Sequence, residues 1–143
     1  MKRFGLNIIL IICLTVLSLG MAACQKDSIN GKLDGQWQIM KIEKLSDGSV
    51  EIPASGRYIC IYLHVVNLNP SSGYMGRPYS GNMSYDKQTG ILSIDFPYNK
   101  GEEAVQLAPW GIYSNPVTFH VETVNGKQLV LRSDATIVTC RRY

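Results

Sequence analysis

The sequence lacks the residue spacings that metal, nucleotide and nucleophile chemistry require. Its two histidines, His64 and His120, belong to no His-x-x-x-His pattern, and no Cys-x-x-Cys pair is present. No glycine-rich loop precedes a helical pattern, and neither Ser80-Gly81 nor Ser133-Asp134 lies in a Gly-x-Ser-x-Gly turn. We therefore expect no metal site, no cofactor and no catalytic residue. A hydrolase whose histidine meets a hydroxyl or thiol only in space stays open as the alternative.

Basic residues are also few once the N-terminus is set aside. Lys2 and Arg3 are the only charges before an apolar run from Leu6 to Leu19. This run is shorter than the about 20 apolar residues that span a membrane, and its layout is that of a signal peptide, which we place at residues 1–23. Without it, twelve basic residues face eleven acidic ones. The remaining chain is nearly neutral, which argues against nucleic-acid binding.

The end of the signal peptide predicts a lipid anchor. Leu19-Gly-Met-Ala-Ala-Cys24 resembles a lipobox, the motif in which small residues precede a cysteine that is acylated, with Met21 where leucine is usual. We expect cleavage before Cys24, lipid on that cysteine, and a tether at residues 24–34. Cleavage after Ala22, which would release a soluble protein, is the alternative.

The residues after the anchor predict where the protein is held. Cys-Gln-Lys-Asp-Ser, residues 24–28, resembles the export tag of surface lipoproteins of the Bacteroidetes. That resemblance implies the cell envelope, attachment to the outer membrane and surface exposure. Residues 35–143 suit one domain with one core. Its two cysteines, Cys60 and Cys140, could form a disulfide in an oxidising compartment or remain free.

From Gly35 onward the pattern is that of short strands, with no helix. β-Branched and aromatic residues alternate over runs that end at Gly, Asn, Asp or Pro. The clearest run predicts a single strand at residues 57–68, in which Ile59, Ile61, Leu63 and Val65 share one face. Asn125-Gly126 predicts a tight hairpin between strands 117–124 and 128–132.

Further hairpin turns are expected at residues 46–49 and 87–90, which makes the chain an up-and-down meander. The remaining expected strands are 36–44, 50–52, 78–85, 91–96, 105–107 and 136–142. Eight or nine strands in one small domain predict an all-β fold, an antiparallel up-and-down β-barrel, because closure removes exposed edges. A two-sheet β-sandwich is the alternative.

The first and last expected strands carry a family resemblance. Gly35-Gln36-Trp37 opens the first strand and Arg141-Arg142 lies on the last. In this the chain resembles the lipocalins, in which Gly-x-Trp opens the first strand and a basic residue of the last strand packs against the tryptophan. It is similar to a lipocalin-like lipoprotein of the Bacteroidetes type. The resemblance implies a barrel that holds one small hydrophobic or amphipathic ligand.

Two segments are candidates for lining the mouth of such a barrel. Residues 72–85 mix aromatic and methionine side chains with glycines, and we expect residues 108–116 to form an ordered, non-helical loop that caps one barrel end. The candidate ligand-binding residues are Trp37, Tyr74, Met75, Arg77, Tyr79, Met83, Tyr85, Trp110 and Tyr113. Arg77 would face an acidic headgroup. Alternatively, residues 72–85 form a bulged edge strand, and Trp110 and Tyr113 plug the core.

Two functions follow from these patterns. The first is a membrane-anchored lipoprotein whose barrel binds a small hydrophobic or amphipathic ligand. The second is a structural or accessory subunit of a protein complex in the cell envelope, with a packed barrel and no ligand. Its candidate contact is the outer face that carries Tyr58, Tyr62 and His64, because tyrosine is enriched in interfaces.

Overall fold

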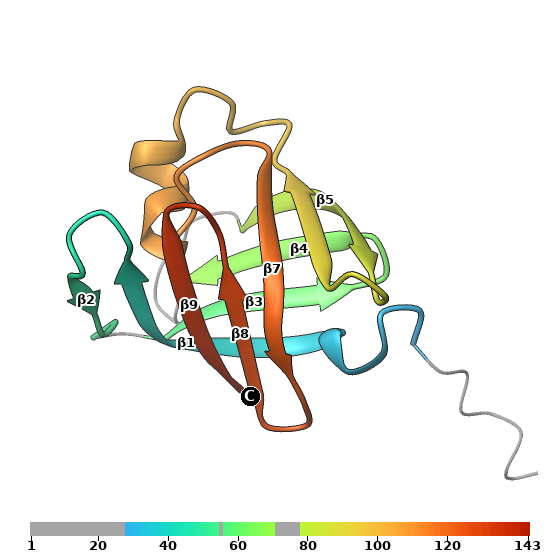
Figure 1. Ribbon diagram of the computed structural model, residues 1–143. Coiled ribbons are helices and arrows are strands. Elements are labelled where there is room, and N and C mark those ends of the chain that lie inside the picture. Colours follow the sequence, from blue (N-terminus) through green and yellow to red (C-terminus); the bar gives the residue numbers. More distant parts are fainter. Residues whose placement is uncertain (1–27, 55, 71–77) are drawn as a thin grey trace, which may run out of the picture.

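The computed structural model describes residues 28–54, 56–70 and 78–143, and these fold into a closed antiparallel barrel (Figure 1). The strands are β1 (Gly35–Lys44), β2 (Val50–Glu51), β3 (Arg57–Tyr62), β4 (Val65–Pro70), β5 (Tyr79–Asp86), β6 (Ile91–Asp95), β7 (Val117–Val124), β8 (Gln128–Arg132) and β9 (Thr136–Arg142). β1 pairs with both β3 and β9, so eight strands close on themselves, while β2 adds a short pair to β1. The all-β barrel is confirmed, and the β-sandwich alternative is wrong.

The up-and-down topology gives the barrel two ends, which we call the base and the mouth. The base holds the short helix η1 (Gly31–Leu33), the turns at 63–64, 87–90 and 125–127, and the end of β9. The mouth holds the turns at 45–49 and 133–135 and the connection 97–116, which contains η2 (Glu103–Leu107) and η3 (Ala108–Trp110). In Figure 1 the orange helical turns mark the mouth and the label C lies at the base.

The core lies inside the barrel because alternate residues of each strand face inward. On β7, for example, Val117, Phe119 and Val121 are buried while Thr118 and His120 are exposed. The hairpin predicted at Asn125-Gly126 is confirmed: Asn125 accepts hydrogen bonds from the backbone N–H groups of Lys127 and Gln128 through its side-chain oxygen. The turns expected at 46–49 and 87–90 are confirmed as well.

The single strand predicted at residues 57–68 is wrong. The chain reverses at Leu63-His64, so that Tyr62 pairs directly with Val65 and the segment forms the hairpin β3–β4. Leu63 and Val65 are therefore exposed, not aligned with Ile59 and Ile61 on a buried face. The prediction failed because the turn contains no Gly, Asn or Pro, and the alternation of residue types continues across it.

The expectation of no helix is also wrong. Residues 105–107, predicted as a strand, belong to the π-helical turn η2, and η3 opens the segment 108–116 that was predicted to be non-helical. Pro109 suits the first positions of such a turn because it has no N–H to donate. No helix among the described residues is long and apolar enough to cross a membrane.

The folded part begins earlier than the tether predicted at 24–34 allows. Leu33 is fully buried in the core cluster, and Asn30 is buried as well. The side-chain amide of Asn30 donates to the Leu63 carbonyl at 2.6 Å and to Asp34 Oδ1 at 2.6 Å. These contacts fasten the segment before β1 to the base of the barrel.

The disulfide considered between Cys60 and Cys140 is not formed. Both thiols are free, and the two cysteines lie on strands that flank β1 on opposite sides. Cys140 points into the core, whereas Cys60 is half-buried and accepts a hydrogen bond from the Asn69 side chain at 3.2 Å. The two side chains occupy opposite faces of the sheet, a geometry that no disulfide spans without backbone movement.

Candidate functional site

The base of the barrel is plugged by Trp37. Its indole is fully buried, and Nε1 donates to the Leu33 carbonyl at 2.8 Å. The guanidinium of Arg142 lies over the ring, with Cζ 4.3 Å from the centroid, and donates to the carbonyls of Asp34 and Lys32. The stacking that the resemblance implied between a basic residue of the last strand and Trp37 is confirmed. Gly35 makes room for it, because a Cβ there would lie 1.8 Å from Arg142 Nη1.

The mouth is plugged by the connection between β6 and β7. Leu107, Trp110 and Ile112 are buried in the core cluster. The plug is fastened by Thr136, whose buried hydroxyl donates to the Gly111 carbonyl at 2.6 Å, and by Arg57, whose Nη1 donates to the Pro109 carbonyl at 2.7 Å. The segment 108–116 therefore caps this end of the barrel, as expected.

Trp110 differs from Trp37 in one respect. Its ring is buried and packs edge-on against Tyr79, with centroids 5.5 Å apart, yet its Nε1 has no hydrogen-bond partner among the described residues. A buried donor without a partner carries a cost in free energy of about 1 to 3 kcal/mol. The mouth plug thus contains an unsatisfied polar group that the base plug does not have.

Between the plugs the described interior is filled by side chains. The largest fully buried ones include Phe96, Phe119, Leu92, Leu129 and Leu131, all in one cluster. They occupy the space in which the resemblance implied a ligand. Three hollows that the described residues form open to the surface.

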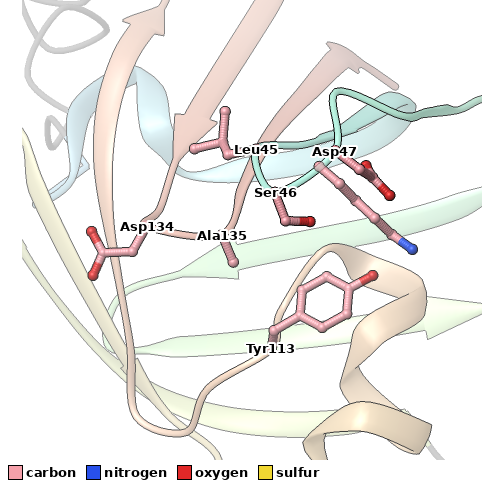
Figure 2. Close-up of a pocket in the computed structure, with 7 residues that line it drawn as sticks. Leu45, Ser46, Asp47, Tyr113, Asp134 and Ala135 are labelled. Atoms are coloured by element: carbon pink, nitrogen blue, oxygen red, sulfur yellow. The ribbon is translucent and has the colours of Figure 1, made fainter.

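The largest of these hollows lies at the mouth and has a volume of about 490 Å³. Figure 2 shows the turn after β1, with Leu45, Ser46 and Asp47, on one side, Tyr113 on another, and the turn at Asp134-Ala135 on the third. A second hollow of about 350 Å³ shares Tyr113, Asp134 and Ala135 with it. Both are within the size range of small-molecule sites, roughly 300 to 1,000 Å³.

The polar groups of the mouth hollow are of both signs. Lys44 Nζ lies 5.8 Å from the centroid of the Tyr113 ring, a distance at which a cation and an aromatic face attract each other. Hydrogen bonds from the side chain and backbone of Ser49 lower the pKa of Asp47, so this carboxyl group is ionised at neutral pH. With Asp134, the hollow offers two carboxylates, one ammonium group and an aromatic ring that is 39% exposed.

Of the predicted ligand-binding residues that the structure describes, only Tyr113 lines this hollow. Trp37, Met83 and Trp110 are core residues, while Tyr79 and Tyr85 are half-buried and pack against the core. Tyr74, Met75 and Arg77 lie outside the described residues. The bulged edge strand considered for residues 72–85 does not describe β5, which pairs with both β4 and β6.

Sequence reasoning missed Lys44, Leu45, Asp47 and Asp134. They lie at the end of β1 and in two turns that are almost 90 positions apart in the chain and meet only because β1 pairs with β9. No local motif marks them.

The histidines lie elsewhere. His64 is in the β3–β4 turn at the base and His120 is on the outer face of β7, and neither lines a described hollow. Within the described ranges, no three His, Cys, Asp or Glu side chains are grouped closely enough to hold a metal ion.

Comparisons with known proteins agree with the barrel fold. The family model described as "Lipocalin-like domain" matches residues 18–143. A lipocalin-like protein from Bacteroides uniformis is similar in structure, with a TM-score of 0.63 and 22% sequence identity over 79% of this chain and 100% of that one. An uncharacterized protein from Bacteroides eggerthii has a TM-score of 0.58 and 17% identity, over 77% and 98% of the two chains. No curated protein matches the sequence.

Proposed function

The chain belongs to the lipocalin-like domain family, and on that premise we propose that it is a lipoprotein of the outer membrane, held by lipid on Cys24, whose barrel binds a small amphipathic ligand at its mouth. The proposed role is binding; His64 and His120, the histidines that the hydrolase alternative needs, line none of the three hollows described above. The mouth hollow carries the proposal.

The position of this hollow supports a ligand at the mouth. With the described interior filled, an apolar molecule cannot enter the barrel unless core side chains are displaced, which costs the contacts of a close-packed core. The mouth hollow needs no such displacement. Tyr113 follows the plug directly in the chain, and Ala135 precedes Thr136, which fastens the plug, so these two parts of the lining are held in place before any ligand arrives.

The lining also indicates the chemistry of the ligand. Leu45 and the Tyr113 ring offer apolar surface, while Asp47, Asp134 and Lys44 offer charge at the rim. A molecule with an apolar part and a polar head that donates hydrogen bonds matches this distribution. The ionised Asp47 favours a head with hydroxyl or amine donors.

The binding experiment compares two tyrosines of the same connection. Native mass spectrometry of the chain from residue 24, purified gently from its own host, should show a co-purifying small molecule. Tyr113→Ala should lose it, whereas Tyr98→Ala, which removes a side chain that is 90% exposed and lines no described hollow, should keep it. Equal retention in both variants would exclude the mouth hollow as the site.

The anchor is tested separately. The lipobox predicts that mass spectrometry of the N-terminal peptide finds acyl chains on Cys24, and that the protein sediments with membranes. Cys24→Ser should move it to the soluble fraction. An unmodified peptide that begins at Ala23 would show that ordinary cleavage after Ala22 releases the protein.

A second function is favoured by the filled interior itself: an accessory subunit of an envelope complex that carries no ligand. Tyr62 and His64 are exposed as this function requires, while Tyr58 is half-buried against Tyr143. A clean apo mass, together with envelope proteins that co-purify with the wild type but not with Tyr62→Ser, would support it. Unchanged partners after Tyr62→Ser would count against it.

A further inference from the structure

The tip of the β3–β4 hairpin is an apolar projection at the base of the barrel. Tyr62 is 70% exposed, Leu63 42% and Val65 41%, and Tyr62 and Val65 are direct cross-strand partners on the outer face. We call these three residues the base tip. Turns at a soluble surface usually carry small polar residues, so three adjacent apolar side chains here are not explained by the fold.

Leu63 conflicts with the backbone of the turn as well as with solvent. Its φ of +55° is the only positive value outside glycine among the described residues. Bulky side chains rarely adopt this region, which Gly and Asn occupy readily. An apolar side chain that is both strained and exposed points to a role for the side chain itself.

The base tip lies where the chain leaves for the proposed anchor. Asn30 binds the Leu63 carbonyl through its side chain, and the preceding Ile29 is a further exposed apolar residue. Cys24 is only four residues before Ser28, the first described residue. Four extended residues reach about 14 Å, so lipid on Cys24 would hold the base close to a membrane surface.

Charge is divided between the two ends of the barrel. Among the described residues, the base carries five basic side chains and two acidic ones: Lys32, Lys87, Lys127, Arg141 and Arg142 against Asp34 and Asp86. The mouth carries four basic and seven acidic ones: Lys44, Arg57, Lys100 and Arg132 against Glu43, Asp47, Glu51, Asp95, Glu102, Glu103 and Asp134. An anionic surface therefore attracts the base and repels the mouth.

We propose that the base of the barrel is a membrane-docking surface, in which the base tip enters the interface of an anionic bilayer and the surrounding lysines and arginines face its headgroups. The inference rests on the proposed anchor at Cys24 and adds an orientation to it. β1 spans about 33 Å from base to mouth, so the mouth hollow faces away from the membrane. Tyrosine and leucine are side chains that favour this interfacial depth.

The test places a reporter at each end by the same substitution. The chain from residue 24 is coupled through Cys24 to a maleimide-bearing phospholipid in vesicles of phosphatidylethanolamine and phosphatidylglycerol that contain brominated lipid. Coupling favours Cys24 because burial raises the pKa of Cys60 and raises that of Cys140 to about 12, which slows the reaction of these two thiols. Tyr62→Trp reports on the base and Tyr98→Trp on the mouth; both positions are exposed.

The indole introduced at position 62 should be quenched at least about threefold more strongly than the one at position 98. Adding Leu63→Asn, which keeps the left-handed backbone and removes the apolar group, should reduce quenching at position 62. Leu45→Asn at the mouth is the matched control and should leave it unchanged. Replacing phosphatidylethanolamine and phosphatidylglycerol by phosphatidylcholine, with the same maleimide-bearing and brominated lipids, should weaken the quenching because the anionic charge is removed.

Equal quenching at both positions, stronger quenching at position 98, or none at either would overturn the proposed orientation. The coupling is chemical, so each result is independent of whether the host acylates Cys24. If the chain docks through its base but is found unacylated in its host, the proposed lipid anchor is wrong and the docking surface still stands. If the host acylates Cys24 but the indole at position 62 is not quenched, the lipid anchor stands and the docking surface is wrong.

Discussion

The two ends of the barrel are closed by tryptophans in different environments. At the base, Trp37 has its N–H bonded to Leu33 and its face covered by Arg142. At the mouth, Trp110 has no partner for its N–H in the part of the chain that the structure describes, and the surrounding connection exposes Tyr98 and Val105 almost fully. Satisfied polar groups stabilise a structure, whereas a buried donor without a partner lowers its stability. The base plug is thus the more firmly bonded of the two, and the mouth plug is the one beside the proposed ligand site.

The strongest test of this difference is Trp37→Ala. The indole is fully buried, so its removal should lower the free energy of unfolding by about 3 to 5 kcal/mol. Urea denaturation followed by circular dichroism measures the change. A loss below about 1 kcal/mol would contradict the structural role of the base plug.

Alkaline pH should weaken the half of the core that adjoins the base. Burial raises the pKa of Cys140 from 9.0 to about 12. In the unfolded chain the thiol loses its proton near its ordinary pKa, so between about pH 9 and 12 the folded chain binds more protons and stability falls as pH rises. The full window corresponds to about 4 kcal/mol. Cys140→Ala should flatten this part of the stability curve; an identical curve would refute the burial of the thiol.

The neighbouring arginines Arg141 and Arg142 provide a further test of the base plug. Arg142→Ala removes the cation over Trp37 and two hydrogen bonds to backbone carbonyls, and should cost about 2 kcal/mol. Arg141→Ala is the matched control, since among the described residues its exposed side chain bonds only Gln38, and its loss should cost less than about 0.5 kcal/mol. Thermal unfolding of the two variants would show whether the order is as expected.

The smallest effect is expected at the mouth. Trp110→Phe removes a donor that has no partner among the described residues, so it should change the free energy of unfolding by less than about 1 kcal/mol. Trp37→Phe leaves the Leu33 carbonyl without its donor and should cost about 1 to 3 kcal/mol. If the two substitutions lower the free energy of unfolding equally, the difference in hydrogen bonding between the two plugs does not affect stability.

The fold was predictable where side-chain pattern and turn chemistry agreed. The strands around Asn125-Gly126 have the expected bounds, because Asn-Gly favours the left-handed backbone that the turn needs. The β3–β4 hairpin was missed because its turn carries Leu63-His64 instead. These residues suit the proposed membrane contact better than they suit a turn, and rules based on local sequence fail at such places.

The site was less predictable than the fold. Tyr113 was anticipated from its aromatic segment, but Lys44, Asp47 and Asp134 become neighbours of it only through the pairing of β1 with β9. That side chains fill the interior could not be predicted from the sequence either. Alternation shows which residues face inward, but not whether their summed volume leaves a space.

The pairing of β1 with β9 also decides when the protein can fold. Trp37 lies opposite Arg142, so the two edges that seal the barrel are separated by nearly the whole domain. Contacts so distant in the chain make folding slow and leave strand edges open until the end has been delivered. A chain that crosses a membrane from its N-terminus would stay unsealed, and dependent on protection from aggregation, until its final residues have followed.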